Sequence, residues 1–543
     1  MMKVRKTVIS AAALLAAAVA SAQNLNPTVV VTNTYERSAE GIDKPAQPIE
    51  VPDTVSRFNL DMDYEVQPTP YAGAYEFRPY LVQLRPGARE NGEHRLDARL
   101  GLGYGFHPEA DVVYTPLMAG NARVNLYLRH RSYFGRYRSI GLDGNRLEWD
   151  GSSRFNAAES NSRIGADAIW SWSGGQLTAD VFYRNIFADD KKTVGSFNSL
   201  GARARIQSHP RGSRSWEGGA AILHTGGNDL RENYINLDGK MGMDLLSGKI
   251  EIGIGYDVIS TSHPAVNGTA GVLNLTPRYL FRLGDFSFNL GVKASITHHS
   301  SDTYYKGAPF SLFPDAAVSY EILPDAIVAY AQAGGRNTLN AAGNAMEKSP
   351  FLPMFPGLSG LTRECVNARI GVRGNLLERI YYNAAVGYFT QEGRQFWGIT
   401  EGTGGEILPA LTRTKVKALF ADVALGWQSE SVQLDARALF HKSWLDDKLH
   451  CFELPAASLD LKGMYNWGGR IKAGVTLEGA TRQVSDLAIV PGYLDLSLLA
   501  EAGVNHYLSA WLKVGNLLGQ TIQRIPFYAQ DGIYFTIGAH LIF

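Results

Sequence analysis

The sequence predicts an all-β protein, a transmembrane antiparallel β-barrel of about 22 strands with a short, extended N-terminal segment. Three observations predict this class. Nonpolar and polar residues alternate over runs of about ten residues. No run of roughly 20 nonpolar residues follows the N-terminal region, so no membrane helix is expected. Short turns alternate with longer polar connections along the chain, as in barrels of outer membranes.

The first 22 residues have the features of a secretory signal peptide. Three basic residues precede a nonpolar run over residues 8–19, and small residues at 20–22 provide a cleavage position. The nonpolar run is too short to span a bilayer. We expect cleavage after Ala22 and export to the cell outer membrane. The expected organisation is a signal peptide over residues 1–22, a proline-rich periplasmic or lumenal segment over 23–93, and a barrel over 94–543.

Composition excludes several classes of function. The chain has 52 basic and 52 acidic residues, so its formal charge is zero and no nucleic-acid partner is expected. Its only two cysteines, Cys365 and Cys451, exclude a disulfide scaffold. Both are expected on the oxidising external side, where they form either one disulfide between two loops or two unpaired thiols.

The alternation of side chains is the main evidence for strands. In residues 95–106 the lipid-facing set is expected to be Leu96, Ala98, Leu100, Leu102, Tyr104 and Phe106, and the lumen-facing set Arg95, Asp97, Arg99, Gly101 and Gly103. Residues 123–129, 249–257, 432–441 and 458–467 repeat the pattern. A soluble β-sandwich also alternates, but its strands are typically only about 5 to 6 residues long. Runs that end in aromatic residues favour a membrane barrel, where rings lie at the interfaces.

Connections of two lengths indicate the two sides of the membrane. Tight periplasmic turns are expected near residues 174–175, 246–249, 283–285, 323–326, 375–379, 429–431, 468–469 and 507–509. Longer external loops are expected over residues 138–162, 300–306, 337–364, 393–414, 446–454 and 483–491. Trp149, Tyr304, Tyr305 and Trp397 lie in or beside these loops, where they could stack on sugars, contact a surface partner or anchor the interface.

The last residues predict a closing strand. Phe535, Ile537, Ala539, Leu541 and Phe543 share one face and end the chain on an aromatic residue. We interpret them as the signal read by the barrel-insertion machinery. The alternative is that the last strand simply closes the sheet, which a barrel requires in any case.

Two segments near the C-terminus resemble a known family. Residues 491–496 (PGYLDL) and 508–519 (LSAWLKVGNLLG) are similar to the final strands of TonB-dependent receptors. The resemblance covers roughly residues 95–543 and implies a 22-stranded barrel. A TonB-box-like segment, Thr28, Val29, Val30, Val31 and Thr32, implies an energising periplasmic partner that binds by β-augmentation. The alternative is an ordinary β-prone segment.

The N-terminal region departs from this family. A receptor plug needs well over a hundred residues and typically carries an Ile-Arg-Gly motif, whereas about 70 proline-rich residues lie between Gln23 and the first expected strand. Because barrels of this size normally have a plugged lumen, another element must fill it: this segment, inward-folded loops such as 337–364, or another protein. The lumen residues Arg95, Asp97, Arg99, Asp180, Arg184, Asp435 and Arg437 either hold such a filler, or hydrate the lumen or pair across neighbouring strands.

Three functions remain open after the sequence alone. The first is transport across the outer membrane, and the second is a non-transporting subunit or scaffold of an outer-membrane assembly or secretion complex. The third, an enzyme, has no nucleophile, paired-carboxylate or metal motif in its favour, so no catalytic residue, cofactor or metal is expected. Expected partners are outer-membrane lipid, the barrel-insertion machinery, and an energising periplasmic protein or other outer-membrane and surface proteins.

Overall fold

The computed structural model describes residues 94–543 except residues 105, 191–193, 209–213, 265, 302–303, 305–306, 325, 349–358, 378, 402–406 and 531. The expected signal peptide, the proline-rich segment and the TonB-box-like residues 28–32 lie outside the described residues. They stay predictions.

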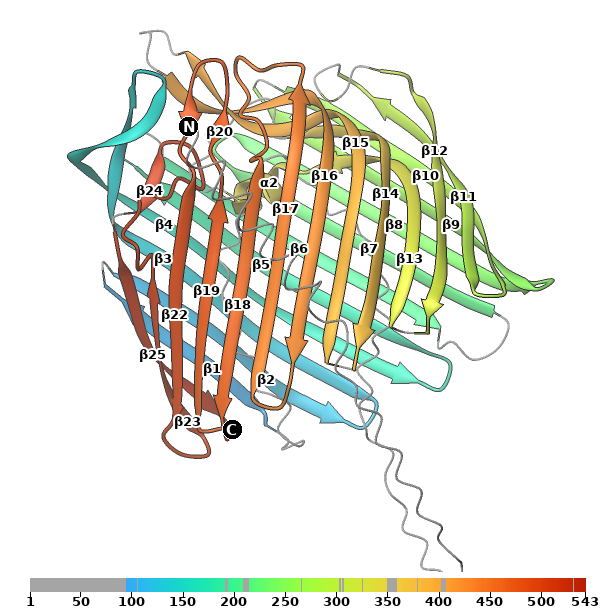
Figure 1. Ribbon diagram of the computed structural model, residues 1–543, viewed down its shortest axis with the longest axis horizontal. Coiled ribbons are helices and arrows are strands. Elements are labelled where there is room, and N and C mark those ends of the chain that lie inside the picture. The colour runs from blue at the N-terminus through green and yellow to red at the C-terminus, as the bar shows by residue number, and fades with distance from the viewer. Residues whose placement is uncertain are drawn as a thin grey trace, which may run out of the picture. The chain divides into compact units, whose positions relative to one another are not determined.

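The described chain is almost entirely strand. Twenty-two strands form the wall of a closed antiparallel barrel (Figure 1). They are β1 (Leu96–Gly103), β2 (His107–Ala119), β3 (Ala122–Asp143), β4 (Arg146–Trp172), β5 (Gly175–Asp189), β6 (Val194–Ser208), β7 (Arg214–Gly227), β8 (Leu230–Leu245), β9 (Gly248–His263), β10 (Val266–Leu283), β11 (Phe286–His299), β12 (Phe310–Leu323), β13 (Ile327–Asn340), β14 (Gly360–Leu376), β15 (Ile380–Glu401), β16 (Ile407–Gln428), β17 (Val432–Leu445), β18 (Ala457–Trp467), β19 (Ile471–Ala480), β22 (Tyr493–Gly503), β23 (Leu508–Gly515) and β25 (Tyr534–Ile542).

Four short elements belong to the external connections rather than to the wall. They are β20 (Gln483–Val484), β21 (Ile489–Val490), β24 (Tyr528–Gln530) and the helix α2 (Ala342–Lys348). Among the described residues, no helix is long and nonpolar enough to cross a membrane.

The wall closes because its first and last strands pair. β1 and β25 are antiparallel, with Leu102 opposite Ile537 and Ala98 opposite Leu541. The backbone of Leu96 and Phe543 exchanges hydrogen bonds of 2.9 and 2.8 Å at the end of this seam. Closure satisfies the backbone groups of both edges, which hydrocarbon cannot do. The predicted fold class and strand number are confirmed.

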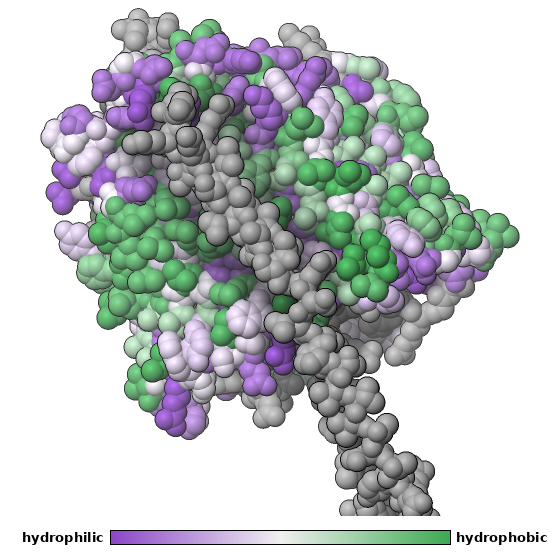
Figure 2. All heavy atoms as spheres, in the orientation of Figure 1, coloured by the Kyte–Doolittle hydropathy of each residue, from purple (hydrophilic) through white to green (hydrophobic). Residues whose placement is uncertain are grey.

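The predicted alternation is also confirmed. Leu100, Leu102, Tyr104 and Phe106 are exposed on the outer face, and the same holds for nonpolar residues of β9, β17 and β18. On the face seen in Figure 2, hydrophilic residues gather at the end that carries the long connections, and hydrophobic side chains cover much of the wall below. An outer wall of exposed nonpolar side chains is stable only in contact with lipid.

The terminal strand has the predicted face. Phe535, Ile537 and Phe543 are exposed on the outside, with Ala539 and Leu541 partly buried between neighbours. Phe543 stacks on Tyr507 of the last periplasmic turn at 5.2 Å between ring centroids. Its reading by the insertion machinery stays a prediction.

The strand bounds confirm the predicted tight turns and four of the six predicted external loops, those over residues 300–306, 337–364, 446–454 and 483–491. All eight predicted tight turns join strands at the periplasmic end. The predicted loops at 138–162 and 393–414 are wrong. β3 and β4 form a long hairpin over the first range, and in the second β15 continues to Glu401 and β16 begins at Ile407. Polar residues there belong to strands that rise above the membrane, where both faces meet water or other external residues.

The seam generates a testable consequence. Trp511 of β23 is buried in the lumen against Gly101 and Gly538. A Cβ at Gly538 would lie 2.1 Å from the carbonyl oxygen of Leu100 and 2.4 Å from Cε2 of Trp511. We expect Gly538→Ala to destabilise the barrel by about 1–3 kcal/mol through overpacking, measured by urea unfolding in detergent micelles.

Gly120→Ala is the matched control, because a Cβ at Gly120 meets no atom within 4 Å. Equal stability of Gly538→Ala and Gly120→Ala would contradict this packing of the seam.

Candidate functional site

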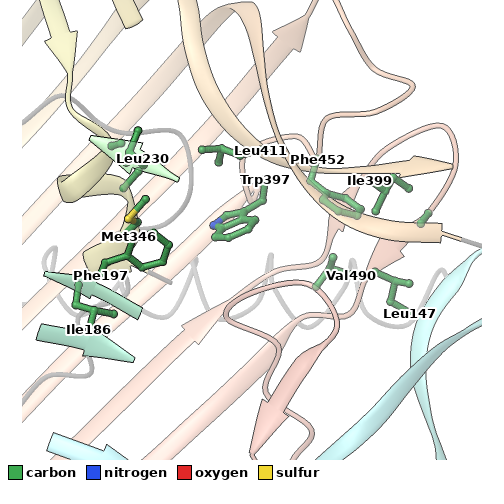
Figure 3. Packing of buried hydrophobic residues seen from close by; sticks show 13 residues of the cluster. Leu147, Ile186, Phe197, Leu230, Met346, Trp397, Ile399, Leu411, Phe452 and Val490 are labelled. Atoms are coloured by element: carbon green, nitrogen blue, oxygen red, sulfur yellow. The ribbon is translucent and has the colours of Figure 1, made fainter. Parts of the chain in front are cut away.

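The external connections fold inward and form a cap over the mouth of the barrel. Its core is a single cluster of buried hydrophobic residues that joins β5, β6 and β8 on one side to β15 and β16 across the lumen (Figure 3). The connections after β13, β17, β19 and β23 contribute to the cap. The buried members are Leu147, Ile186, Phe197, Leu230, Ala342, Ala345, Met346, Trp397, Ile399, Leu411, Phe452, Ala488 and Val490.

Helix α2 is held against the wall by a buried arginine. Nη1 of Arg184, on β5, lies 2.7 Å from Oε2 of Glu347, and its Nη2 donates to the carbonyl oxygen of Gly343 at 3.0 Å. The side chain of Arg184 is 4% exposed and that of Glu347 47%. Removing the glutamate or the helix would leave a buried charge without its partner, which is costly. Arg184 therefore fixes the connection between β13 and β14 in the lumen.

A buried carboxylate holds the other end of the same helix. Glu232 of β8 accepts hydrogen bonds from Ser359, from the backbone N–H groups of Ala342 and Gly343, and from Thr261. The first N–H groups of a helix have no partner within it, and their dipoles favour a negative charge. Burial raises the pKa of Glu232 above its usual range, and these hydrogen bonds oppose the rise.

Glu232 and Gly343 lie outside the lipid-facing band. The outward neighbours of Glu232, Arg231 and Asn233, are polar and exposed. A Cβ at Gly343 would lie 2.5 Å from Oγ1 of Thr225 on β7, so the helix approaches the wall closely there. The lack of a side chain at Gly343 allows this approach.

The connection between β23 and β25 is held in the same way. Nη2 of Arg524 lies 2.6 Å from Asp495 and 3.4 Å from Glu478, which face the lumen on β22 and β19. Nε2 of Gln523 donates to the carbonyl oxygen of Leu147 at 2.6 Å, and the hydroxyl of Tyr528 donates to Asp190 at 2.8 Å. These contacts reach three separate parts of the wall.

The connection between β17 and β18 completes the cap. The backbone N–H of Phe452 donates to the carbonyl oxygen of Trp397 at 3.1 Å. The backbone of Cys451 forms an isolated antiparallel β-bridge with Gly398 of β15. Cys451 is completely buried in a neighbouring cluster with Phe389, Phe396 and Leu445. Burial raises the pKa of the Cys451 thiol to about 12. Cys365 is also a free thiol, so the disulfide considered from the sequence is not formed in the structure.

Three of the seven predicted lumen charges pair with a charged residue on a neighbouring strand. Asp97 lies 3.0 Å from His540, Asp180 2.9 Å from Arg163, and Arg437 2.8 Å from Asp422. Asp435 accepts a hydrogen bond from the hydroxyl of Tyr381. The Arg99 guanidinium lies 4.4 Å from the centre of the Trp511 ring. The carbonyl oxygen of Arg95 accepts a hydrogen bond from the backbone N–H of Thr115. Among the predicted lumen residues, Arg184 contacts an element that fills part of the lumen, the helix α2.

A charged pocket of about 90 Å³ lies on the lumen wall beside Arg524. Its lining combines basic and acidic side chains of β1–β3 with those of β18, β19, β22 and β23. Among them are Arg99, Glu109, Arg131, Asp460 and Lys513. Groups of both signs suit a hydrated pathway or a polar ligand.

Two of the four aromatics expected near external loops are buried, and a third lies between arginines. Tyr304 and Trp397 are buried in the cap region, and Trp149 lies between the guanidinium groups of Arg138 and Arg154, 4.5 and 4.7 Å from its ring. Tyr305 lies outside the described residues. The residues missed from the sequence were Glu232, Arg524 and the cap core. The sequence signal for the cap core was a short nonpolar run inside a polar connection, such as Leu487–Val490.

Across the described residues, no group of three or more His, Cys, Asp or Glu is arranged to hold a metal ion.

Comparison with known proteins identifies the fold. No family model matches the chain, and no curated protein sequence matches it. Solved structures do match. The ferric-catecholate import receptor Fiu from E. coli K12 aligns with a TM-score of 0.59 and 10% identity over 82% of this chain and 81% of its own.

Two further transporters align equally well. The FrpB iron transporter from Neisseria meningitidis gives a TM-score of 0.60 at 10% identity, covering 82% of this chain and 81% of its own. The copper transporter OprC gives 0.60 at 9% identity, covering 83% and 82%. Identities this low report on fold. The described chain is a TonB-dependent-receptor-like β-barrel of the outer-membrane type.

Proposed function

We propose that this protein serves transport across the outer membrane, with the external cap as its movable part. The observation that carries the proposal is a wide barrel whose external mouth is covered by the connections between its strands. The cap is held by side-chain contacts such as Arg184–Glu347 and Arg524–Asp495. Both cysteines are free, so no disulfide locks the described part of the cap.

The structural neighbours support the class of function and leave the substrate open. They are receptors or transporters for ferric catecholate, iron and copper. The charged pocket below the cap gives a solute polar groups along the lumen wall. A route of this kind needs the cap connections to move away from the mouth.

An energised mechanism would use the N-terminal segment. The TonB-box-like residues Thr28–Thr32 would add a strand to a periplasmic energising partner. About 70 residues separate the expected signal peptide from the barrel, and this segment is too short for a receptor plug. In this proposal the cap performs part of the closure that a plug provides in the family.

One observation favours a second function, a fixed subunit of an outer-membrane complex. The cap has a continuous hydrophobic core that joins several connections, and the hairpin of β3 and β4 extends far beyond a membrane span. A rigid, closed top with tall hairpins suits a docking platform. Stoichiometric co-purification with other outer-membrane proteins would favour this function.

Release of α2 should open the barrel. We expect wild-type protein in planar bilayers to conduct weakly and Arg184→Met to conduct about ten-fold more, if the lost contacts shift the cap equilibrium by about 1.4 kcal/mol. Deletion of residues 24–93 tests whether the N-terminal segment contributes to closure of the barrel. We expect the deletion to raise the conductance further.

Arg437→Met is the control, because Arg437 pairs with Asp422 of the adjacent strand of the wall. Transport is contradicted if Arg184→Met and the deletion conduct no more than wild type while both remain folded barrels.

Cys451 provides a direct reporter of cap opening. In a Cys365→Ala background we expect the Cys451 thiol to resist maleimide near neutral pH, because it is buried and its raised pKa keeps it protonated. Trp397→Ala removes a buried ring of the cap core at a cost of about 3–5 kcal/mol and should make Cys451 react. Labelling is measured by mass spectrometry.

Trp444→Ala is the control, because Trp444 lies exposed on the outer face of β17. Rapid labelling of Cys451 in the protein with both tryptophans intact would show that the cap is not packed as described.

A further inference from the structure

The outer face of β11–β15 carries an unusual row of small side chains. Cross-strand pairing places Ala316, Ala333 and Ala368 side by side on β12, β13 and β14, with Leu290 of β11 at one end and Tyr388 of β15 at the other. Neighbouring strands lie about 4.8 Å apart, so three alanines in a row lower the surface over about 10 Å.

The row forms the floor of a groove in the lipid-facing wall. The groove is open, has a volume of about 1100 Å³ and extends over β11–β17. Ala331 continues the floor in the next row toward the periplasm, opposite Val318 and Ile370. Phe288 and Leu290 border it on one side and Leu419 and Phe440 on the other. Its lining is almost wholly nonpolar, as a site for hydrocarbon requires.

One end of the groove carries positive charge. The row of alanines continues through Tyr388 and Leu419 to Lys442 of β17, which lines the groove. Lys417 of β16 lies one row farther out, opposite Trp444. Both ammonium groups are on exposed side chains, and neither has an ion pair with a described residue.

A neighbouring lysine on the same face, in contrast, forms an ion pair. Nζ of Lys415 lies 2.9 Å from Oε1 of Glu392, so that pair is neutral. β17 runs from a periplasmic turn outward, so Lys417 and Lys442 lie toward the external leaflet, just beyond the exposed Leu419 and Phe440. Unpaired ammonium groups at the edge of hydrocarbon attract lipid phosphates.

We propose that this groove binds a phosphorylated glycolipid of the external leaflet, with acyl chains over the alanine floor and a headgroup phosphate between Lys417 and Lys442. The volume suits several chains of one lipid. A second protein surface would have to place an acidic residue against the two lysines, because an unpaired charge buried in the membrane is costly. The inference does not depend on the transport proposal.

The test uses the full-length mature barrel in a mild detergent. It is incubated with diphosphorylated lipid A, with the dephosphorylated form of the same lipid, or with a zwitterionic phospholipid, and bound lipid is counted by native mass spectrometry. We expect retention of the diphosphorylated lipid, and a loss of about five-fold in affinity for each lysine in Lys417→Gln and Lys442→Gln. Ala333→Leu fills the floor and should reduce binding of the phosphorylated lipid without changing the charge.

Two matched controls should bind as wild type. Lys448→Gln removes an exposed lysine of the external connection after β17, and Ala220→Leu adds the same side chain to the outer face of β7. Equal retention of the phosphorylated and dephosphorylated lipids, or unchanged binding in both Lys417→Gln and Ala333→Leu, would overturn the proposal. A dimer that forms through this face in place of lipid binding would also overturn it.

Discussion

Hydrocarbon offers no hydrogen-bond partner to the peptide backbone, and the structure of this chain follows from that constraint. Every N–H and C=O group in the membrane must pair within the protein, and a sheet achieves this only when its edges meet. The pairing of β1 with β25 removes both edges. Once the sheet is closed, strand geometry places alternate side chains in lipid and in the lumen. The nonpolar residues on the outer face and the charged pairs inside are two results of the same closure.

A closed barrel of this width creates a second problem, which is its own interior. The described connections solve part of it by folding into the external mouth and packing there around a hydrophobic core. The buried Arg184 and Glu232 and the partly buried Arg524 then tie these connections to the wall. Removing one partner of such a contact is costly, because it leaves a buried charge unpaired. A transporter and a fixed scaffold would use such contacts differently, and the reporter thiol of Cys451 distinguishes a mobile cap from a rigid one.

The barrel could be predicted almost completely from the sequence, because it depends on local patterns. Alternation in segments such as residues 95–106 and 432–441, the tight turns and the terminal aromatic residue are each visible within a few neighbours in the chain. The cap was not predictable in the same way. Its core unites residues such as Leu147, Phe197, Trp397 and Phe452, which meet only after closure. Polar composition also suggested loops at 138–162 and 393–414, since strands above the membrane no longer need a nonpolar face. For the lumen charges, cross-strand pairing was correct for Asp97, Asp180 and Arg437. Arg184 differs because its partner belongs to a connection.

Closure of the seam is the claim on which the rest depends, and a crosslink between its strands tests it most directly. In a chain lacking Cys365 and Cys451, cysteines at Leu102 and Ile537 face each other across β1 and β25. They should form a disulfide after mild oxidation in native membranes and give a circularised band on gels, whereas Leu102 paired with Ala539 should not. Failure of the first pair with efficient crosslinking of the second, or no crosslink in a folded barrel, would contradict the closed wall.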